Sequence, residues 1–315
     1  MCRRYNRKMN PETQRAEIMA LKEARKAVIL AHNYQLPEVQ DVADFVGDSL
    51  ALARQAAQTE ARVIVFAGVH FMAETAAILN PGKTVLIPDP EAGCSLADTI
   101  NAADVKAWKE EHPDGIVVAY VNTSAAVKAL ADVCVTSSNA SEMVSKLPKD
   151  RPIFFLPDMF LGAHVERETG RKLDIWAGEC HVHAAITPEE VELAKAAHPE
   201  AELLVHPECG CTSSVRYSFP EAKVCSTEAM VRLAQKSPAQ KFLVATEVGI
   251  IHRMEQAAPD KTFIPISRGA VCRYMKMITL EKIYLSLLQN RFVVEVPGDT
   301  AQAARHSLEA MLAVG

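Results

Sequence analysis

The sequence predicts an α/β protein made of three units related by pseudo-threefold symmetry, each a parallel sheet covered by helices. Three observations predict this fold class. Short runs of Val, Ile and Leu alternate with longer amphipathic stretches, which is typical of parallel sheets covered on both faces. A helix followed by a strand recurs at a spacing of 86 residues. The length of 315 residues, 49% of them hydrophobic, suffices for more than one such unit.

The repeat is clearest in its second and third copies. Residues 105–114 form an amphipathic segment that ends in His-Pro and an acid, and an apolar run follows at 116–120. Residues 191–200 repeat this pattern in register before the apolar run 203–206. Because proline disfavours the helical conformation at the residue before it, each block predicts a helix that stops there and leads into a buried strand.

The first copy lies at the start of the chain and lacks the His-Pro stop. Asn10 followed by Pro11 predicts a helix N-cap with proline at the first helical position. We expect this helix to extend to about Lys26 and the first strand to occupy residues 28–31.

Each unit is expected to continue with two further strands separated by helices. The pattern predicts second strands at 63–67, 133–136 and 223–226, and third strands at 84–87, 153–156 and 242–245. The units then span residues 1–98, 99–184 and 185–279, and the helical segment 280–315 is expected to pack back on the first unit. The alternative is one doubly wound domain whose helix-strand units resemble one another by chance.

Charge and hydropathy exclude several functional classes. The chain has 34 Lys and Arg against 39 Asp and Glu, so no basic field is available to hold a nucleic acid. The longest apolar runs fall far short of the ~20 residues that a membrane span needs, and the N-terminal segment lacks a hydrophobic signal core. We therefore expect a cytoplasmic protein that binds neither nucleic acid nor membrane.

Pairs of polar residues follow the first strand of each unit. Ligands of parallel α/β sheets bind at the carboxyl ends of the strands, and residues two apart in an extended chain point to the same side. A single such residue is usually an ordinary loop or core residue, but three pairs in phase predict six polar groups around a common centre. The pairs are His32 with Tyr34, Tyr120 with Asn122, and His206 with Glu208.

Small and hydroxyl-bearing residues mark the starts of later helices. A helix N-terminus carries partial positive charge, so hydroxyls there suit a carboxylate or a phosphate, although the same residues also serve as plain helix caps. The absence of GxGxxG and GxxxxGK[ST] disfavours a dinucleotide or a nucleoside triphosphate. The segments concerned are Ala67-Gly68, Ser137-Ser138, Ser226-Thr227 and Gly47-Asp48-Ser49-Leu50.

Three of the eight cysteines share one phase of the repeat. Cys94, Cys180 and Cys272 lie 86 and 92 residues apart, each shortly after a glycine, and are expected to meet near the pseudo-axis. Three thiolates without a fourth indicate a metal with one open position. Zinc, completed by histidine or water, and a [4Fe-4S] cluster with one free iron both satisfy this, and a cage of three loops favours the larger cluster.

The other cysteines receive different interpretations. Cys134 and Cys225 fall within expected second strands and are interpreted as small core residues, and Cys2 lies in a terminal segment. Cys209 and Cys211, which flank Gly210, are left open between a redox pair, alternative ligands and neither.

Short segments spread over the whole chain carry a family resemblance. They are Ala31-His32-Asn33-Tyr34-Gln35, Gly47-Asp48-Ser49-Leu50, Phe71-Met72-Ala73-Glu74-Thr75, Ala92-Gly93-Cys94-Ser95-Leu96-Ala97, Tyr120-Val121-Asn122, Thr136-Ser137-Ser138-Asn139-Ala140, His206-Pro207-Glu208-Cys209 and Met275-Lys276. With these segments, and over essentially its whole length, the chain resembles the quinolinate synthase family. The resemblance implies three α/β/α domains in a pseudo-threefold triangle and a [4Fe-4S] cluster held by three cysteines. It also implies condensation of iminoaspartate with dihydroxyacetone phosphate to quinolinate, with release of phosphate and two waters.

The resemblance also implies roles for individual residues. Cys94, Cys180 and Cys272 would ligate the cluster, which would act as a Lewis acid, and Tyr34 and Glu208 would move protons. An aspartate-oxidising enzyme is the implied functional partner. The rival interpretations are another hydro-lyase with an open iron, and an iron-sulfur sensor, which would need a DNA-binding element that the sequence lacks. The residues expected around substrate are His32, Ser49, Tyr120, Asn122, Ser137, His206, Glu208 and Thr227.

Overall fold

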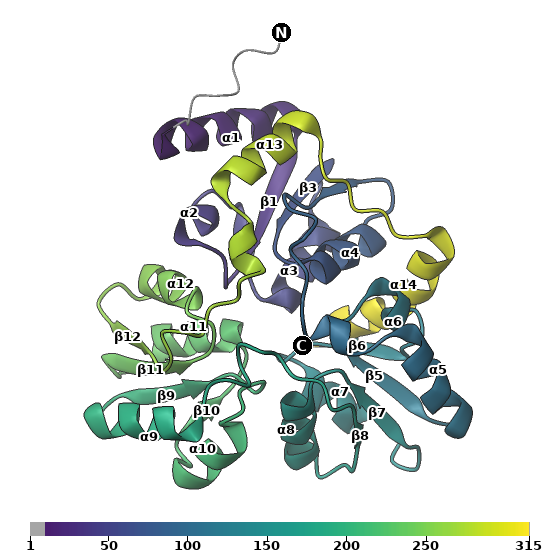
Figure 1. Cartoon of the computed structure of the whole chain (residues 1–315), viewed down its shortest axis with the longest axis vertical. Helices are drawn as coiled ribbons and strands as arrows, with labels where there is room; N and C mark the ends of the chain where they lie inside the picture. The colour runs from purple at the N-terminus through teal and green to yellow at the C-terminus, as the bar shows by residue number, and fades with distance from the viewer. Residues whose placement is uncertain (1–9, 315) are drawn as a thin grey trace.

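The computed structural model describes residues 10–314 and contains three four-stranded parallel sheets, arranged as the corners of a triangle (Figure 1). This architecture confirms the α/β class predicted from the repeat. The first sheet has the order β2-β1-β3-β4 and consists of β1 (Ala27–His32), β2 (Phe45–Gly47), β3 (Val63–Ala67) and β4 (Thr84–Leu86).

The other two sheets repeat this order, so the first strand of each unit always lies between the second and the third. The five residues of β5 are all buried, as expected for an interior strand of a covered sheet. The second sheet, β6-β5-β7-β8, comprises β5 (Ile116–Tyr120), β6 (Val133–Val135), β7 (Ile153–Leu156) and β8 (Asp174–Ile175). The third sheet, β10-β9-β11-β12, comprises β9 (Glu202–Val205), β10 (Lys223–Val224), β11 (Lys241–Ala245) and β12 (Thr262–Pro265).

Helices connect the strands, and two helices follow the third sheet. None of the helices within residues 10–314 is both long and apolar enough to cross a lipid bilayer. The helices are α1 (Pro11–Arg25), α2 (Pro37–Gln40), α3 (Ser49–Gln58), α4 (His70–Leu79), α5 (Ala102–Glu111), α6 (Ala125–Lys128), α7 (Ala140–Lys146), α8 (Met159–Thr169), α9 (Pro188–Ala197), α10 (Thr212–Ser218), α11 (Thr227–Lys236), α12 (Ile250–Ala257), α13 (Leu280–Gln289) and α14 (Gly298–Leu312), with 3-10 turns at Ala97–Thr99 and Met275–Met277.

The helix ends follow the signals that the sequence carries. The side chain of Asn10 accepts a hydrogen bond from the backbone N–H of Thr13, with Pro11 opening α1 as expected. Helices α5 and α9 both begin with a capping box and both end at the histidine of the repeated His-Pro. The repeat is therefore a repeat of helix boundaries as well as of apolar spacing.

The expected strand numbering of the first unit is wrong by one. The second strand is the three-residue β2, which is too short to show a periodic pattern, and residues 63–67 form the third strand. The fourth strands β8 and β12 were also not expected. Because β2 is the counterpart of β6 and β10, Gly47-Asp48-Ser49 corresponds to Ser137-Ser138 and Ser226-Thr227, and Ala67-Gly68 does not.

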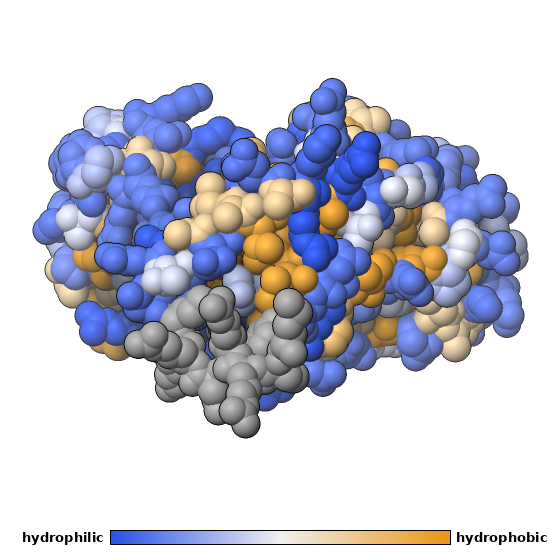
Figure 2. Space-filling model, turned by 90° about the horizontal axis from the view of Figure 1, so that it is seen from above, coloured by the Kyte–Doolittle hydropathy of each residue, from blue (hydrophilic) through white to orange (hydrophobic). Residues whose placement is uncertain are grey.

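The two terminal helices pack in different places. Helix α13 lies on α1 and also contacts β3, as expected for a return to the first unit. Helix α14 lies mainly against β6 and α6 of the second unit and touches α3 and α4 of the first, so the expectation for the segment 280–315 is too narrow. Seen from the side of α1 and α13, the surface is largely hydrophilic with apolar groups near its middle (Figure 2).

The second and third units meet at a polar contact between α8 and α10. Arg216 on α10 lies 3.0 Å from Nδ1 of His164 and 2.5 Å from the Glu168 carboxylate, both on α8. Burial, and then the Arg216 charge, lower the pKa of His164 from 6.5 to about 4. His164 is therefore neutral in the folded protein at pH values where the unfolded chain binds a proton.

This contact predicts a stability loss in mild acid. Between pH 6.5 and 4 the unfolded chain takes up a proton at His164 that the folded chain does not, so stability falls as the pH falls through this window, by at most about 3 kcal/mol. His164→Asn should reduce the pH dependence of the melting temperature between pH 7 and 4, and His306→Asn, at an exposed histidine, should not. Equal slopes in wild type and His164→Asn would contradict this assignment.

Candidate active site and metal centre

One cavity lies where the three units meet, with about 720 Å³ of space that is partly open to solvent, and every site residue expected from the sequence lines it. These residues come from the strand ends, the helix starts and the cysteine loops of all three units. They are His32, Tyr34, Ser49, Cys94, Tyr120, Asn122, Ser137, Cys180, His206, Glu208, Thr227 and Cys272.

The backbone places the three cysteines in equivalent positions. In each unit, the backbone carbonyl of the residue two before the cysteine accepts a hydrogen bond. The donor is the backbone N–H of the third residue after that unit's third strand. These bonds are His70 N to Ala92 O at 2.7 Å, Met159 N to Gly178 O at 2.8 Å and Val248 N to Ala270 O at 2.9 Å. Each cysteine carbonyl then accepts from the N–H four residues later, of Asp98, Ala184 and Lys276, at 3.1, 2.8 and 3.2 Å.

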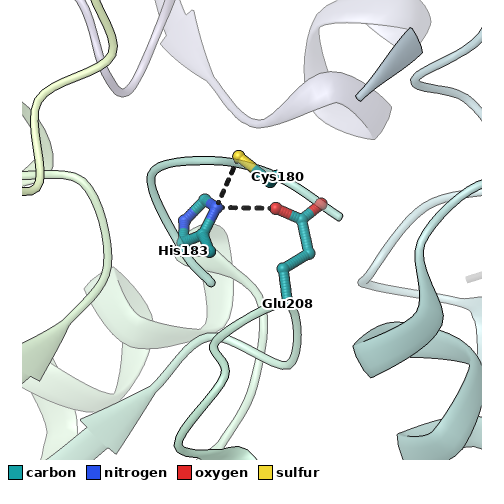
Figure 3. A group of neighbouring side chains, drawn as sticks. All are labelled: Cys180, His183 and Glu208. Atoms are coloured by element: carbon teal, nitrogen blue, oxygen red, sulfur yellow. Dashed lines mark hydrogen bonds and ion pairs between the residues drawn. The ribbon is translucent and has the colours of Figure 1, made fainter. Parts of the chain in front are cut away.

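A buried ion pair lies beside the second cysteine (Figure 3). Nδ1 of His183 is 2.8 Å from Oε2 of Glu208 and 3.3 Å from Sγ of Cys180. Burial alone lowers the pKa of His183, but Cys180 and Glu208 outweigh it and raise that pKa to about 10. Burial alone raises the pKa of Glu208, and His183 reverses this to about 2. Glu208 is thus held as a carboxylate within the cavity.

The second nitrogen of His183 connects this pair to Tyr34. Nε2 is 2.9 Å from Oγ1 of Thr246 and 3.3 Å from the Tyr34 hydroxyl, which itself lies 2.5 Å from Thr246 Oγ1. Burial, with the Glu208 charge, raises the pKa of Tyr34 well above its usual value. Tyr34 is therefore a neutral phenol that keeps its proton and joins Glu208 through one continuous set of polar contacts.

The other strand-end residues are also buried and largely uncharged. Burial is the main cause that lowers the pKa of both His32 and His206 to about 3, and burial also raises the pKa of Tyr120. Within the described part of the chain, Nδ1 of His206, Oε1 of Glu208 and Oδ1 of Asn122 are buried without a hydrogen-bond partner. Because buried polar atoms are nearly always paired, these three indicate a polar ligand in the cavity.

The helix starts of the three units are linked to each other. Asp48 caps α3, and its carboxylate accepts a hydrogen bond of 2.7 Å from the Ser138 hydroxyl, which lies 2.9 Å from the hydroxyl of Ser226. The Thr227 hydroxyl accepts a hydrogen bond of 2.9 Å from Nδ2 of Asn33. Asp48 and Ser226 cap α3 and α11, and Asp48, Ser49 and Thr227 line the cavity.

The donor set at the cysteines fits a thiophilic metal group. Burial raises the pKa of the Cys94 thiol to about 12 and also raises the pKa of Cys180 and Cys272. Buried thiols of this kind become thiolates when a metal cation coordinates them. Separately, Cys180, His183 and Glu208 offer one ligand atom each within 4.8 Å of one another and could hold a metal ion.

The other cysteines that the structure describes do not line the cavity. Cys134 is buried in β6, as expected for a core residue. Cys225 follows β10 and is only partly buried, because that strand ends at Val224. Cys209 and Cys211 are fully buried free thiols in the core of the third unit, and Cys2 lies outside the described residues.

Several residues at the cavity were missed in the sequence. His183 stands three residues after Cys180, so a Cys-x-x-His spacing was available as a signal. The sequence indicated Asp48 only as one residue of the helix start Gly47-Asp48-Ser49-Leu50, without a role of its own. Thr246 and Glu247 follow β11, and they become recognisable only when the third strands of the three units are aligned correctly.

Known proteins resemble this chain over nearly its whole length. The model described as Quinolinate synthetase A protein matches residues 16–313. A quinolinate synthase of Thermus thermophilus is 66% identical over 308 residues, covering 98% of this chain and 99% of the relative. Quinolinate synthases of Pyrobaculum aerophilum and Mycobacterium tuberculosis are 54% and 53% identical, covering 94% and 95% of this chain and 97% and 88% of the relatives.

Proposed function

The chain belongs to the quinolinate synthetase A protein family of NAD biosynthesis enzymes, and we propose that it condenses iminoaspartate with dihydroxyacetone phosphate to form quinolinate. One observation carries this proposal: a single cavity joins three equivalent cysteine loops to buried polar atoms that lack partners. The substrates supply all seven carbons and the nitrogen of the product, and phosphate and two waters leave. The site must therefore bind two anionic molecules and move several protons.

Cys94, Cys180 and Cys272 would hold a [4Fe-4S] cluster with one iron left open. When bound, this cluster supplies a Lewis acid that assists the departure of hydroxyl groups. Support comes from the shared backbone pattern of the three loops and from buried thiols that need a cation to ionise. Cys180, His183 and Glu208 could instead hold a single metal ion, but His183 and Glu208 are already paired with each other at 2.8 Å.

Glu208 and Tyr34 are proposed to transfer protons. The pair with His183 keeps Glu208 ionised, so Oε1, which has no hydrogen-bond partner in the described chain, is free to accept a proton from substrate. The raised pKa of Tyr34 keeps its hydroxyl protonated and able to donate. His183 connects the two groups. Correctly placed general acids and bases contribute ~10²- to 10⁴-fold each.

The remaining lining residues are proposed to bind the substrates. Ser49, Ser137 and Thr227 stand at helix starts, where hydroxyls and free N–H groups suit phosphate and carboxylate oxygens. His32, Tyr120, Asn122 and His206 supply neutral donors and acceptors around them. The burial of these side chains would keep water from the reactive imine.

The same proposal includes a cytoplasmic location and functional coupling to an aspartate-oxidising enzyme. Imines hydrolyse readily in water, so an enzyme that consumes one benefits from a nearby source. The net charge of −5 supports neither a nucleic-acid partner nor an anionic lipid surface.

The proposal is tested by assaying anaerobically purified protein for quinolinate. Iminoaspartate would be generated in place by an aspartate-oxidising enzyme and supplied with dihydroxyacetone phosphate. We expect quinolinate and phosphate in equal amounts. Dehydration of other hydroxy acids without quinolinate would favour a different hydro-lyase, and iron uptake without any turnover would favour a sensor.

Substitution of the cysteines should separate ligands from bystanders. Cys94→Ala, Cys180→Ala and Cys272→Ala should each abolish the visible absorption of the cluster and lower the iron content of anaerobic protein. Cys225→Ala, which removes a partly buried thiol outside the cavity, should leave both unchanged. Full iron content in any of the first three variants would remove that cysteine from the ligand set.

Conservative substitutions should separate proton transfer from binding. Tyr34→Phe and Glu208→Gln keep side-chain shape and should lower kcat ~100-fold or more while the cluster absorption stays intact. Tyr217→Phe, at an exposed tyrosine, is the matched control and should leave kcat unchanged. A normal kcat with a raised KM would reassign the substituted residue to binding.

A further inference from the structure

Glu247 is a completely buried carboxylate beside the third cysteine loop, and the proposed chemistry does not use it. It lies two residues after β11, at the edge of the cavity. Its Oε1 accepts a hydrogen bond from the backbone N–H of Cys272 at 3.0 Å and pairs with Nζ of Lys276 at 2.9 Å. Its Oε2 accepts from the N–H of Gly249 at 2.7 Å.

These contacts close the cysteine loop into a ring. The N–H of Cys272 is bound by Glu247, Glu247 is paired with Lys276, and the N–H of Lys276 donates back to the Cys272 carbonyl at 3.2 Å. Both backbone groups of the cysteine are therefore fixed, which limits the positions that its sulfur can take. The pair is neutral overall, so it supplies these contacts without adding net charge beside three thiolates.

The ring also joins the third unit to the first. Nζ of Lys276 donates to the backbone carbonyl of Tyr34, the proposed acid. The fit is tight: a Cβ added at Gly249 would lie 2.6 Å from Nζ of Lys276, 2.8 Å from Oε2 of Glu247 and 2.8 Å from the carbonyl carbon of Tyr34. The side chain of Gln40 adds a hydrogen bond of 2.9 Å to the Gly249 carbonyl.

The other two cysteine loops, those of Cys94 and Cys180, lack an equivalent carboxylate-lysine pair. The position two residues after the third strand is Val69 in the first unit, Asp158 in the second and Glu247 in the third. Asp158 is buried and its Oδ1 accepts a hydrogen bond of 2.7 Å from the backbone N–H of Leu161, and the residue four after Cys180 is alanine. In the first unit the two corresponding residues are Val69 and Asp98, which cannot form a carboxylate-lysine pair. The carboxylate-lysine pair is thus specific to the Cys272 loop.

We propose that Glu247 is a positioning residue that, together with Lys276, holds Cys272 for metal ligation and ties it to the strand end that carries Tyr34. This inference rests on the proposed function, in which Cys272 is a cluster ligand. Partners of metal ligands orient them, and their loss typically lowers metal affinity about 10- to 100-fold.

The test measures iron retention and needs no substrate. Anaerobically reconstituted wild type, Glu247→Gln, Glu247→Val and Lys276→Met would be exposed to a ferrous chelator while the cluster absorption is followed. Glu247→Val introduces the side chain that the first unit has at the equivalent position, Val69. Glu247→Gln keeps the shape and volume of the side chain but replaces one carboxylate oxygen by an amide nitrogen. The control is Asp44→Asn, since Asp44 likewise accepts a backbone N–H, from Ile29 at 2.7 Å, and pairs with Lys22 at 2.8 Å, but away from the cavity.

Iron release should be about 10- to 100-fold faster from Glu247→Val, faster by a smaller factor from Glu247→Gln and Lys276→Met, and unchanged in Asp44→Asn. Melting of the metal-free proteins reports folding, and if Glu247→Val does not fold, the other two variants decide. Wild-type release rates from the folded variants, or equal acceleration in Asp44→Asn, would overturn this inference alone. Wild-type protein that binds no iron would overturn the cluster proposal and this inference with it.

Discussion

The parallel direction of the strands is the constraint on which the rest of the molecule depends. All strands of a parallel sheet end at the same edge, so one central strand in each unit delivers its polar pair to one side. With three such sheets in a triangle, the pairs that follow β1, β5 and β9 reach a single cavity. Reversal of one sheet would remove a third of the lining, including one cysteine loop, and leave the other two without a partner.

Two buried carboxylates at this centre are each paired with a basic side chain. Glu208 is paired with His183 and Glu247 with Lys276, while burial keeps His32 and His206 neutral. Because an unpaired buried charge is costly, this arrangement lets two carboxylates persist inside the protein. The two pairs have separate consequences, since Oε1 of Glu208 makes no hydrogen bond within the described chain, whereas both oxygens of Glu247 accept hydrogen bonds from the backbone.

Much of the fold and the site could be predicted because the repeat is long and carries caps, proline stops and cysteines in one phase. The common position of Cys94, Cys180 and Cys272 within the repeat predicted that they lie at one site, together with the polar residues at the end of each first strand, and all of them line the cavity. The repeat missed β2 and β8, which have three and two residues and offer too few positions for a periodic pattern, whereas the equally short β6 and β10 were located because they recur at corresponding places in its second and third copies. Glu247 lies on a loop, where spacing carries little information and only tertiary contacts reveal its partners, whereas the spacing of His183 from Cys180 was a signal separate from the repeat.

The equivalence of the three cysteine loops lies in main-chain hydrogen bonds, which do not depend on the identity of the side chains between them. A unit that recurs three times in the chain can therefore keep its geometry while its copies carry different residues. Val69, Asp158 and Glu247 occupy one equivalent position in the three units. A symmetric frame in this way encloses an asymmetric space, and a ligand that has no threefold symmetry can be bound in a single orientation.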